Sequence, residues 1–166
     1  MRNSPFYLLL PLILLVACNN KKTLFTLLPS SATNIHFSNS IHETDTVNVL
    51  DFENVYNGGG VGIADFNSDG LQDIYFTGNT VPNKLYLNKG KFQFDDITSI
   101  SGVEGKGRWS RGVATVDINN DGLMDMYVCA SVKDNPEERR NLLYVNQGNN
   151  ENKIPVFKEM ASEYGL

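Results

Sequence analysis

The chain has 166 residues, of which 41% are hydrophobic and 20% are charged, and its formal net charge is −5 at pH 7. The acidic balance argues against a nucleic-acid-binding surface, which needs a basic footprint. Only two cysteines are present, Cys18 and Cys129, so the chain is not a disulfide-stapled scaffold.

Residues 1–17 have the pattern of a targeting segment. Arg2 is the basic residue, and the apolar stretch 6–17 is too short to span a bilayer comfortably. Leu-Val-Ala directly before Cys18 resembles a bacterial lipobox. We therefore predict a lipoprotein signal peptide over 1–17, lipidation of Cys18 and a short linker over 18–23. An ordinary secretory signal or a retained anchor is the alternative.

Residues 24–59 precede the repeated part of the chain. Their first segment, Leu-Phe-Thr-Leu-Leu at 24–28 followed by Asn34-Ile35, is similar to the last strand of each repeat described below. We expect an orphan N-terminal strand here, placed where a ring-closing strand would lie. Residues 38–56 are polar and weakly patterned, which predicts a long loop leading into the first repeat.

Residues 60–111 and 112–166 form two copies of one unit. The copies align over 60–78 with 112–130, over 83–90 with 141–148, and over 94–98 with 157–161. Each copy contains four short segments of β-forming residues, which is the arrangement of a β-propeller blade. The predicted fold class is all-β, with two four-stranded blades and the N-terminal strand of an incomplete propeller.

Each copy carries the acidic sequence Asp-x-Asn-x-Asp-Gly-x-x-Asp between its first two strands. Side-chain oxygens at positions 1, 3, 5 and 9 and the carbonyl at position 7 can converge on one ion, and Gly at position 6 permits the turn. Ligands made only of oxygen favour Ca²⁺ over zinc or copper. The predicted metal ligands are Asp65, Asn67, Asp69, Leu71 and Asp73 in the first loop, and Asp117, Asn119, Asp121, Leu123 and Asp125 in the second.

Two other interpretations of these loops compete with a propeller calcium site. An EF-hand needs a Glu at position 12 and flanking helices, whereas position 12 is Phe76 or Val128 within β-forming runs. A simple hairpin turn needs only one or two Asn, Asp or Gly residues, whereas these loops repeat four ligand types in register. The calcium loop is therefore the favoured interpretation.

The two loops, with the Leu-Tyr-Leu-Asn-Lys-Gly and Phe-x-Asp-Ile-Thr elements at 85–90 and 94–98, resemble the FG-GAP or VCBS repeat. This resemblance implies a calcium-binding propeller of the integrin-α kind. The wider run from 56 to 110 looks like the N-terminal part of large Bacteroidetes-type lipoproteins, which often carry an ASPIC/UnbV module. No such module is visible in this sequence.

Side chains suited to catalysis form no recognisable arrangement. His36 and His42 lack a paired Cys or a Ser/His/Asp set, and we expect surface or packing roles for both. Trp109 is expected to pack between blades, and Cys129 to be a buried core thiol. We predict no enzymatic activity. The alternative is the non-catalytic portion of a surface polysaccharide-degrading enzyme, or of its associated binding protein.

The resemblance and the signal peptide together imply a function. We expect a binding or adhesion segment of an outer-membrane lipoprotein in the cell envelope, periplasmic or surface-exposed, with an unknown protein or glycan ligand. Propellers use about four to eight blades and only two are present. The chain is therefore expected to be a fragment of a longer protein, and to be marginally stable or self-associating alone.

Overall fold

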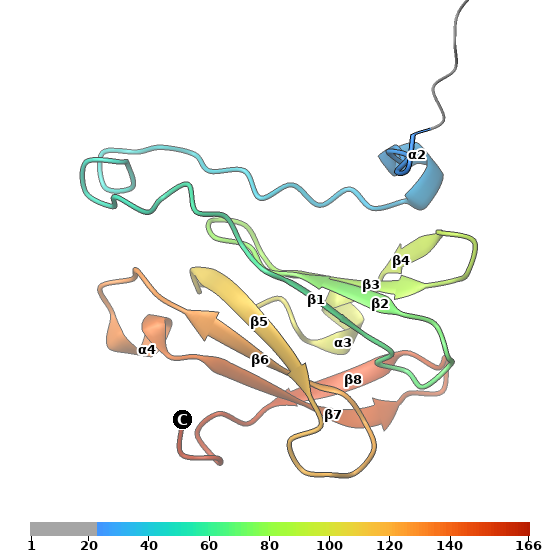
Figure 1. Cartoon of the computed structure of the whole chain (residues 1–166). Helices are drawn as coiled ribbons and strands as arrows, with labels where there is room; N and C mark the ends of the chain where they lie inside the picture. The colour runs from blue at the N-terminus through green and yellow to red at the C-terminus, as the bar shows by residue number, and fades with distance from the viewer. Residues whose placement is uncertain (1–22) are drawn as a thin grey trace, which may run out of the picture.

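The computed structural model describes residues 23–166 and contains two four-stranded antiparallel sheets (Figure 1). The prediction of two four-stranded units in a mostly β fold is confirmed. The first sheet contains β1 (Val61–Ala64), β2 (Asp73–Phe76), β3 (Lys84–Asn88) and β4 (Phe94–Asp96). The second contains β5 (Ser110–Val116), β6 (Asp125–Ala130), β7 (Leu142–Asn149) and β8 (Pro155–Glu159). Short helices are α2 (Ser30–Thr33), α3 (Thr98–Ser101) and α4 (Pro136–Arg139).

Strand register places the large apolar side chains of each sheet on defined faces. In the first sheet Tyr75 lies opposite Leu85, and both are fully buried. Ile74 lies opposite Tyr86 on the other face. Because successive side chains alternate between faces, this register gives the first sheet one face toward the second repeat and one face away from it.

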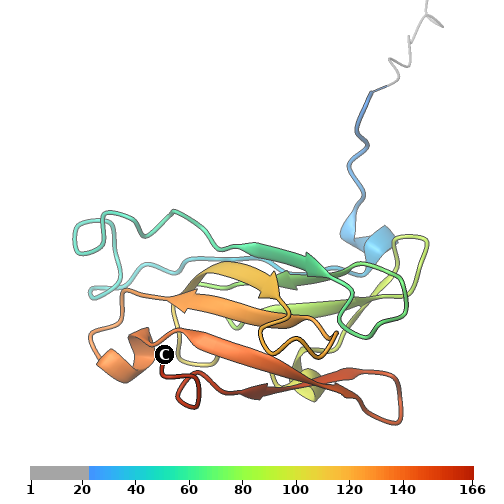
Figure 2. The ribbon, with the colours of Figure 1, turned by 60° about the horizontal axis from the view of Figure 1, so that its bottom comes forward.

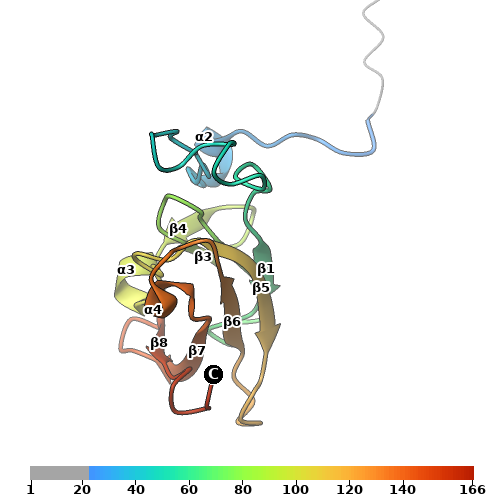
Figure 3. The same ribbon diagram turned by 90° about the vertical axis from the view of Figure 1, so that its left-hand side faces the viewer.

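The two sheets pack face to face and build the core between the repeats. The first strands of the two sheets, β1 and β5, lie beside each other in Figure 3. Gly62 of β1 allows this approach, since a Cβ there would lie 3.2 Å from Thr115 and 3.3 Å from Val113. Both sheets contribute to the buried cluster, which contains Ala64, Phe66, Tyr75, Leu85, Leu87, Ile97, Val103, Met126, Val128, Leu142, Tyr144 and Phe157.

A tyrosine–asparagine pair recurs in both sheets and ties the second strand to the loop before the third. Asn83 Nδ2 donates to the Tyr75 hydroxyl at 2.7 Å, while Asn83 Oδ1 accepts from the Gly78 N–H at 2.9 Å. Asn141 makes the equivalent bonds to the Tyr127 hydroxyl at 2.6 Å and to the Ala130 N–H. The two repeats therefore share buried polar contacts as well as strand order.

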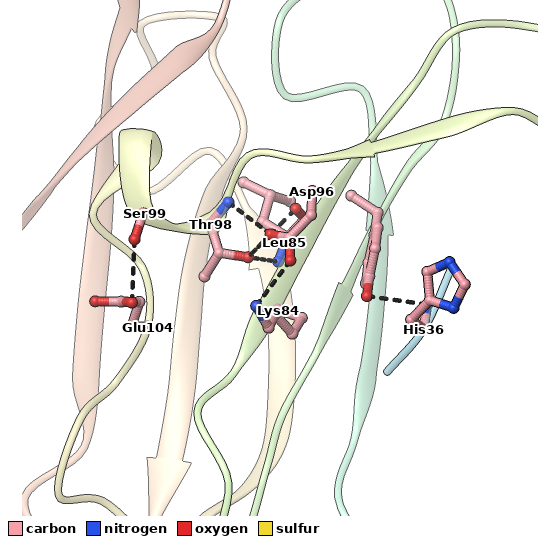
Figure 4. Close-up of polar contacts among 8 residues, drawn as sticks. His36, Lys84, Leu85, Asp96, Thr98, Ser99 and Glu104 are labelled. Atoms are coloured by element: carbon pink, nitrogen blue, oxygen red, sulfur yellow. Dashed lines mark hydrogen bonds and ion pairs between the residues drawn. The ribbon is translucent and has the colours of Figure 1, made fainter. Parts of the chain in front are cut away.

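Polar contacts at the outer edge of the first sheet join β3 to β4 and to the start of α3 (Figure 4). Lys84 of β3 forms an ion pair with Asp96 of β4 at 2.7 Å, and Thr98 Oγ1 accepts from the Leu85 N–H at 2.9 Å. Burial acts to raise the pKa of Asp96, but Lys84 and Thr98 outweigh it and hold that pKa below its usual value. These bonds close the sheet at its fourth strand.

Residues 34–40 run along the face of the first sheet that points away from the second repeat (Figure 2). The Phe37 ring stacks on the Phe76 ring, with centroids 5.0 Å apart. Asn34 Nδ2 donates to the Phe94 carbonyl at 3.0 Å, and the His36 N–H donates to the Tyr86 hydroxyl at 3.3 Å. This extended segment covers part of an apolar face that would otherwise meet solvent.

The predicted strand at 24–28 is not formed. These residues adopt no regular structure, and Leu24, Phe25 and Leu27 are at least 84% exposed. A strand needs a partner edge, and within residues 23–166 no sheet edge lies against this segment. The prediction of an orphan strand was therefore wrong. The predicted loop over 38–56 contains no helix or strand, only an isolated bridge between Thr44 and Val47.

Cys129 is exposed on β6, so the prediction of a buried thiol was wrong. Its strand alternates, and Val128 takes the fully buried position beside it. The predicted lipidation site, Cys18, lies outside the described residues, as does the signal peptide. No helix in the 23–166 region has the length and apolar character needed to cross a bilayer.

Met126 tests the packing between repeats. It is fully buried in the core cluster, so Met126→Ala should reduce the free energy of unfolding by about 2–5 kcal/mol through lost burial and a residual cavity. Met160→Ala is the matched control, because Met160 is only partly buried beside a smaller cluster. Urea denaturation followed by circular dichroism provides the measurement. Equal losses for the two variants would contradict a core centred between the sheets.

Candidate metal centre

The two acidic loops occupy the same place in the two repeats. Residues 65–72 connect β1 to β2, and residues 117–124 connect β5 to β6 (Figure 1). Each loop therefore joins the first two strands of its sheet. The structure thus gives the predicted ligand sets equivalent positions, one per repeat.

In the first loop, the predicted ligands fold the backbone around themselves. Asp65 Oδ1 accepts from the Asp69 N–H at 3.1 Å, and Asp65 Oδ2 accepts from the Gly70 N–H at 2.8 Å. Asn67 Oδ1 also accepts from the Asp69 N–H at 3.2 Å. Asp69 Oδ1 accepts from the Leu71 N–H at 2.8 Å. Side-chain oxygens at positions 1, 3 and 5 are thus directed into the loop.

The second loop repeats these bonds atom for atom. Asp117 accepts from the N–H groups of Asp121 and Gly122 at 3.1 and 2.9 Å. Asn119 Oδ1 accepts from the Asp121 N–H at 3.1 Å, and Asp121 Oδ1 from the Leu123 N–H at 2.8 Å. Two sequences that differ at positions 2, 4 and 8 therefore adopt one loop conformation.

Glycine at position 6 is required by the backbone. Gly70 and Gly122 have φ angles of +87° and +86°, which side chains with a Cβ rarely adopt. A carboxylate oxygen accepts from each of these glycine N–H groups. The sequence predicted this turn, and the structure confirms a left-handed glycine in both copies.

The aspartate at position 9 anchors each loop to the rest of its sheet. Asp73 is fully buried and accepts from the Phe66 N–H at 3.0 Å and from the Asn88 N–H at 2.8 Å. Asp125 is equally buried and accepts from the N–H groups of Ile118 and Asn146 at 2.9 and 2.8 Å. One carboxylate thereby joins the loop, the second strand and the third strand.

Sequence reasoning missed the part that Asn88 and Asn146 take in the site. Besides donating its N–H to the buried aspartate, Asn88 donates its side-chain amide to the Gln72 carbonyl at 2.8 Å. Asn146 does the same to the Met124 carbonyl at 3.2 Å. The recurrence of Asn at the same place in both copies of the Leu-Tyr strand was the available signal.

Burial in the first loop shifts the pKa of its position 9 carboxyl. The pKa of Asp73 is raised to about 6, chiefly by burial; the nearby Asp69 and Asp65 add to the increase, and the two backbone hydrogen bonds oppose it. An ionised Asp73 is therefore unfavourable in the folded protein without a counter-charge. A cation beside these carboxylates would supply that charge.

The chemical types of the donor groups suit a hard cation. Each loop offers three carboxylates, one amide oxygen and one backbone carbonyl, which are ligands typical of Ca²⁺. Over residues 23–166, no three His, Cys, Asp or Glu side chains are already gathered as a metal-binding group. The carboxylates instead accept from backbone N–H groups, so ligation requires some of their oxygens to turn toward the ion.

The other side chains considered from the sequence lie apart from the loops. His36 and His42 are both exposed, in the segment before the first repeat. Trp109 is buried, and its ring centroid lies 6.3 Å from that of Phe52 in the same N-terminal segment. None of the three contributes to an acidic loop.

The fold and the paired loops define a protein built from four-stranded repeats that carry an Asp-rich turn. Residues 65–128 match the family described as the FG-GAP-like repeat. The match begins at the first acidic loop and ends in β6, so it contains both loops. The predicted FG-GAP-like repeat is thus confirmed for this segment.

Curated proteins are similar to part of this chain. Cartilage acidic protein 1 of Xenopus tropicalis is 38% identical over 74 residues, which is 44% of this chain and 11% of the relative. The Homo sapiens protein of the same name is 36% identical over 72 residues, covering 43% of this chain and 11% of the relative. The similarity therefore spans about a tenth of each relative's length.

Asp73 predicts a pH dependence of stability in the presence of chelator. Because its folded-state pKa of about 6 exceeds the usual value near 3.9, the folded state binds the extra proton between those pH values. The contribution of Asp73 to the free energy of unfolding should then decrease as pH rises from about 4 to about 6. Urea denaturation from pH 4 to 7.5, compared with Asp73→Asn, isolates this contribution. A difference between the two proteins that is independent of pH would contradict it.

Proposed function

We propose that this chain is a calcium-binding, FG-GAP-like β-propeller segment of a cell-envelope lipoprotein, with a binding or adhesion role and no catalytic role. The observation that carries the proposal is the repeated loop. Two loops 52 residues apart in the sequence place the same ligand types in the same hydrogen-bonding pattern, each between the first two strands of its sheet. Repetition of four potential ligands at this spacing favours an ion site over an ordinary turn.

Asp65, Asn67, Asp69, the Leu71 carbonyl and Asp73 would hold one ion. The second ion would be held by Asp117, Asn119, Asp121, the Leu123 carbonyl and Asp125. A bound Ca²⁺ supplies positive charge at the centre of each loop. The chain's own residues do the rest: glycine makes the turn, and the buried aspartate links the loop to the third strand. The role of such an ion is to stabilise the blade.

Calcium is favoured over magnesium by the nature of the loops. Magnesium requires a tight octahedron and gives up its waters reluctantly, whereas calcium accepts six to eight oxygens in flexible geometry. Each loop offers five protein groups, with exposed side chains at positions 4 and 5. Waters can complete the coordination from that side.

The lipoprotein part of the proposal rests on the sequence around Cys18. The apolar segment and the small residue before the cysteine support acylation at Cys18, and thus attachment to a membrane through lipid. We place the protein in the cell envelope, at an outer membrane, with a protein or glycan partner. The larger Bacteroidetes-type lipoprotein context, with its ASPIC/UnbV module, is part of the same proposal.

Calcium binding is tested by removing one ligand at a time. Asp69→Ala and Asp121→Ala each delete a carboxylate at position 5 and leave the turn glycine in place, so each should abolish one of two sites. At calcium about a hundred times Kd, each site should add roughly 2.7 kcal/mol to the free energy of unfolding, and each variant should lose that share.

Calorimetric titration and melting with and without chelator provide the measurements. Ser68→Ala is the matched control, because Ser68 lies in the same loop and is not a predicted ligand. A stoichiometry below one ion per intact loop, or a melting temperature of the parent that is the same with and without chelator, would show that the loops are only acidic turns.

The anchor is tested independently with Cys18→Ser. If acyl chains on Cys18 provide the membrane affinity, this variant should leave the detergent phase and lose incorporation of a fatty-acid probe, because the rest of the chain is acidic and polar. Cys129→Ser is the matched control and should partition as the parent does. Unchanged partitioning of Cys18→Ser would favour a retained N-terminal segment over lipidation.

A further inference from the structure

The first acidic loop is contacted by the second repeat. Asn146 Nδ2 donates to the Phe66 carbonyl at 2.8 Å, and Asn149 Nδ2 donates to the Asn67 carbonyl at 2.8 Å. Both asparagines belong to β7, which continues through the turn at 150–154 into β8. Two consecutive carbonyls of the first loop are thus fixed from a segment about 80 residues further along the chain.

The same hairpin also orients a predicted ligand. Asn67 Nδ2 lies 3.5 Å from the Lys153 carbonyl, to which it donates, while its Oδ1 accepts from the Asp69 N–H inside the loop. The same Nδ2 also donates to Asp69 Oδ2 at 2.9 Å, so this amide links the loop's own carboxylate with the second repeat. Only 8% of Asn67 is exposed, so this orientation is held in a confined place.

The second loop lacks an equivalent contact. Asn119 is exposed, and its Nδ2 repeats the bond that Asn67 makes within its loop, here to Asp121 Oδ2 at 2.7 Å. Among residues 23–166, residues 118–121 form hydrogen bonds only within this loop and with its closing aspartate, Asp125. The two loops thus have the same internal geometry and different surroundings.

The charges around the first loop and the hydrogen bonds from the second repeat have opposite effects on cation binding. A hollow of about 470 Å³ lies between this loop and the hairpin, lined by Asp69 and Asn149 and also by Lys89 and Lys153. The two lysines add positive charge to the lining of this hollow, which opposes the arrival of a cation. The hydrogen bonds from Asn146 and Asn149, which fix the loop backbone, act against that repulsion.

We propose that the β7–β8 hairpin of the second repeat is part of the first cation site, with Asn149 and Asn146 as positioning residues that hold the loop ready for the ion. This inference rests on the proposed calcium binding. By linkage, calcium in the first loop also strengthens the contact between the repeats.

Asn149→Ala tests the brace, because Asn149 is exposed and its side chain can be removed with little loss of core packing. The variant is made in the full chain in two backgrounds: Asp121→Ala, which leaves the first site, and Asp69→Ala, which leaves the second. Calorimetric titration with Ca²⁺ should show affinity of the first site falling about two- to tenfold, as for one lost hydrogen bond, with the second site unchanged. Asn152→Ala, in the same hairpin and lining the same hollow, should change neither site.

Hydrogen exchange supplies a second readout. Calcium should slow amide exchange at 149–154 when only the first site is intact, and Asn149→Ala should diminish that protection. If Asn149→Ala leaves the calcium affinity of both sites unchanged, or lowers both equally, the inference is overturned. Absence of calcium binding at both loops of the parent would instead refute the proposed function.

Discussion

A buried carboxylate at the end of each acidic loop is the constraint on which the blade geometry depends. Asp73 and Asp125 each accept two backbone N–H groups, one from the start of the loop and one from the third strand. A buried charge is costly unless it is hydrogen-bonded, so these donors are needed to keep the aspartate in place. Because the same carboxylate also faces the loop, loop conformation and strand alignment cannot vary independently.

The two repeats show how one structural unit behaves in two surroundings. The face of the first sheet that holds Tyr75 and Leu85 is covered by the second sheet. The equivalent face of the second sheet holds Tyr127 and Leu143, where an apolar hollow of about 540 Å³ is lined by Ala114, Val116, Ile118, Tyr127, Leu143, Tyr164 and Leu166. A contiguous apolar surface of this kind marks a place where packing is incomplete. The residues equivalent to the core of the first repeat thus line a partly open hollow in the second repeat, where Leu143 is buried and Tyr127 only partly so.

Local patterns were sufficient to predict most of the fold. The β-forming runs that flank each loop and the glycine at position 6 are short-range signals, and both appear as expected. The strand at 24–28 failed because strand formation depends on a partner edge that residues 24–28 cannot specify. The prediction that Cys129 is buried failed because alternation determines which residues share a face, but not whether that face is covered. The bonds from Asn146 and Asn149 to the first loop depend on how two repeats dock, so spacing within one repeat could not predict them.

Sheet order has a consequence for how the chain acquires its structure. Every strand pairs only with the strand immediately before or after it in the sequence. Hairpins that close short loops lose little chain entropy and form within microseconds. Each four-stranded sheet can therefore assemble by itself before the two sheets dock. Docking of one finished sheet on the other is then the slow, non-local step, and it is also the step that brings Asn149 to the first loop.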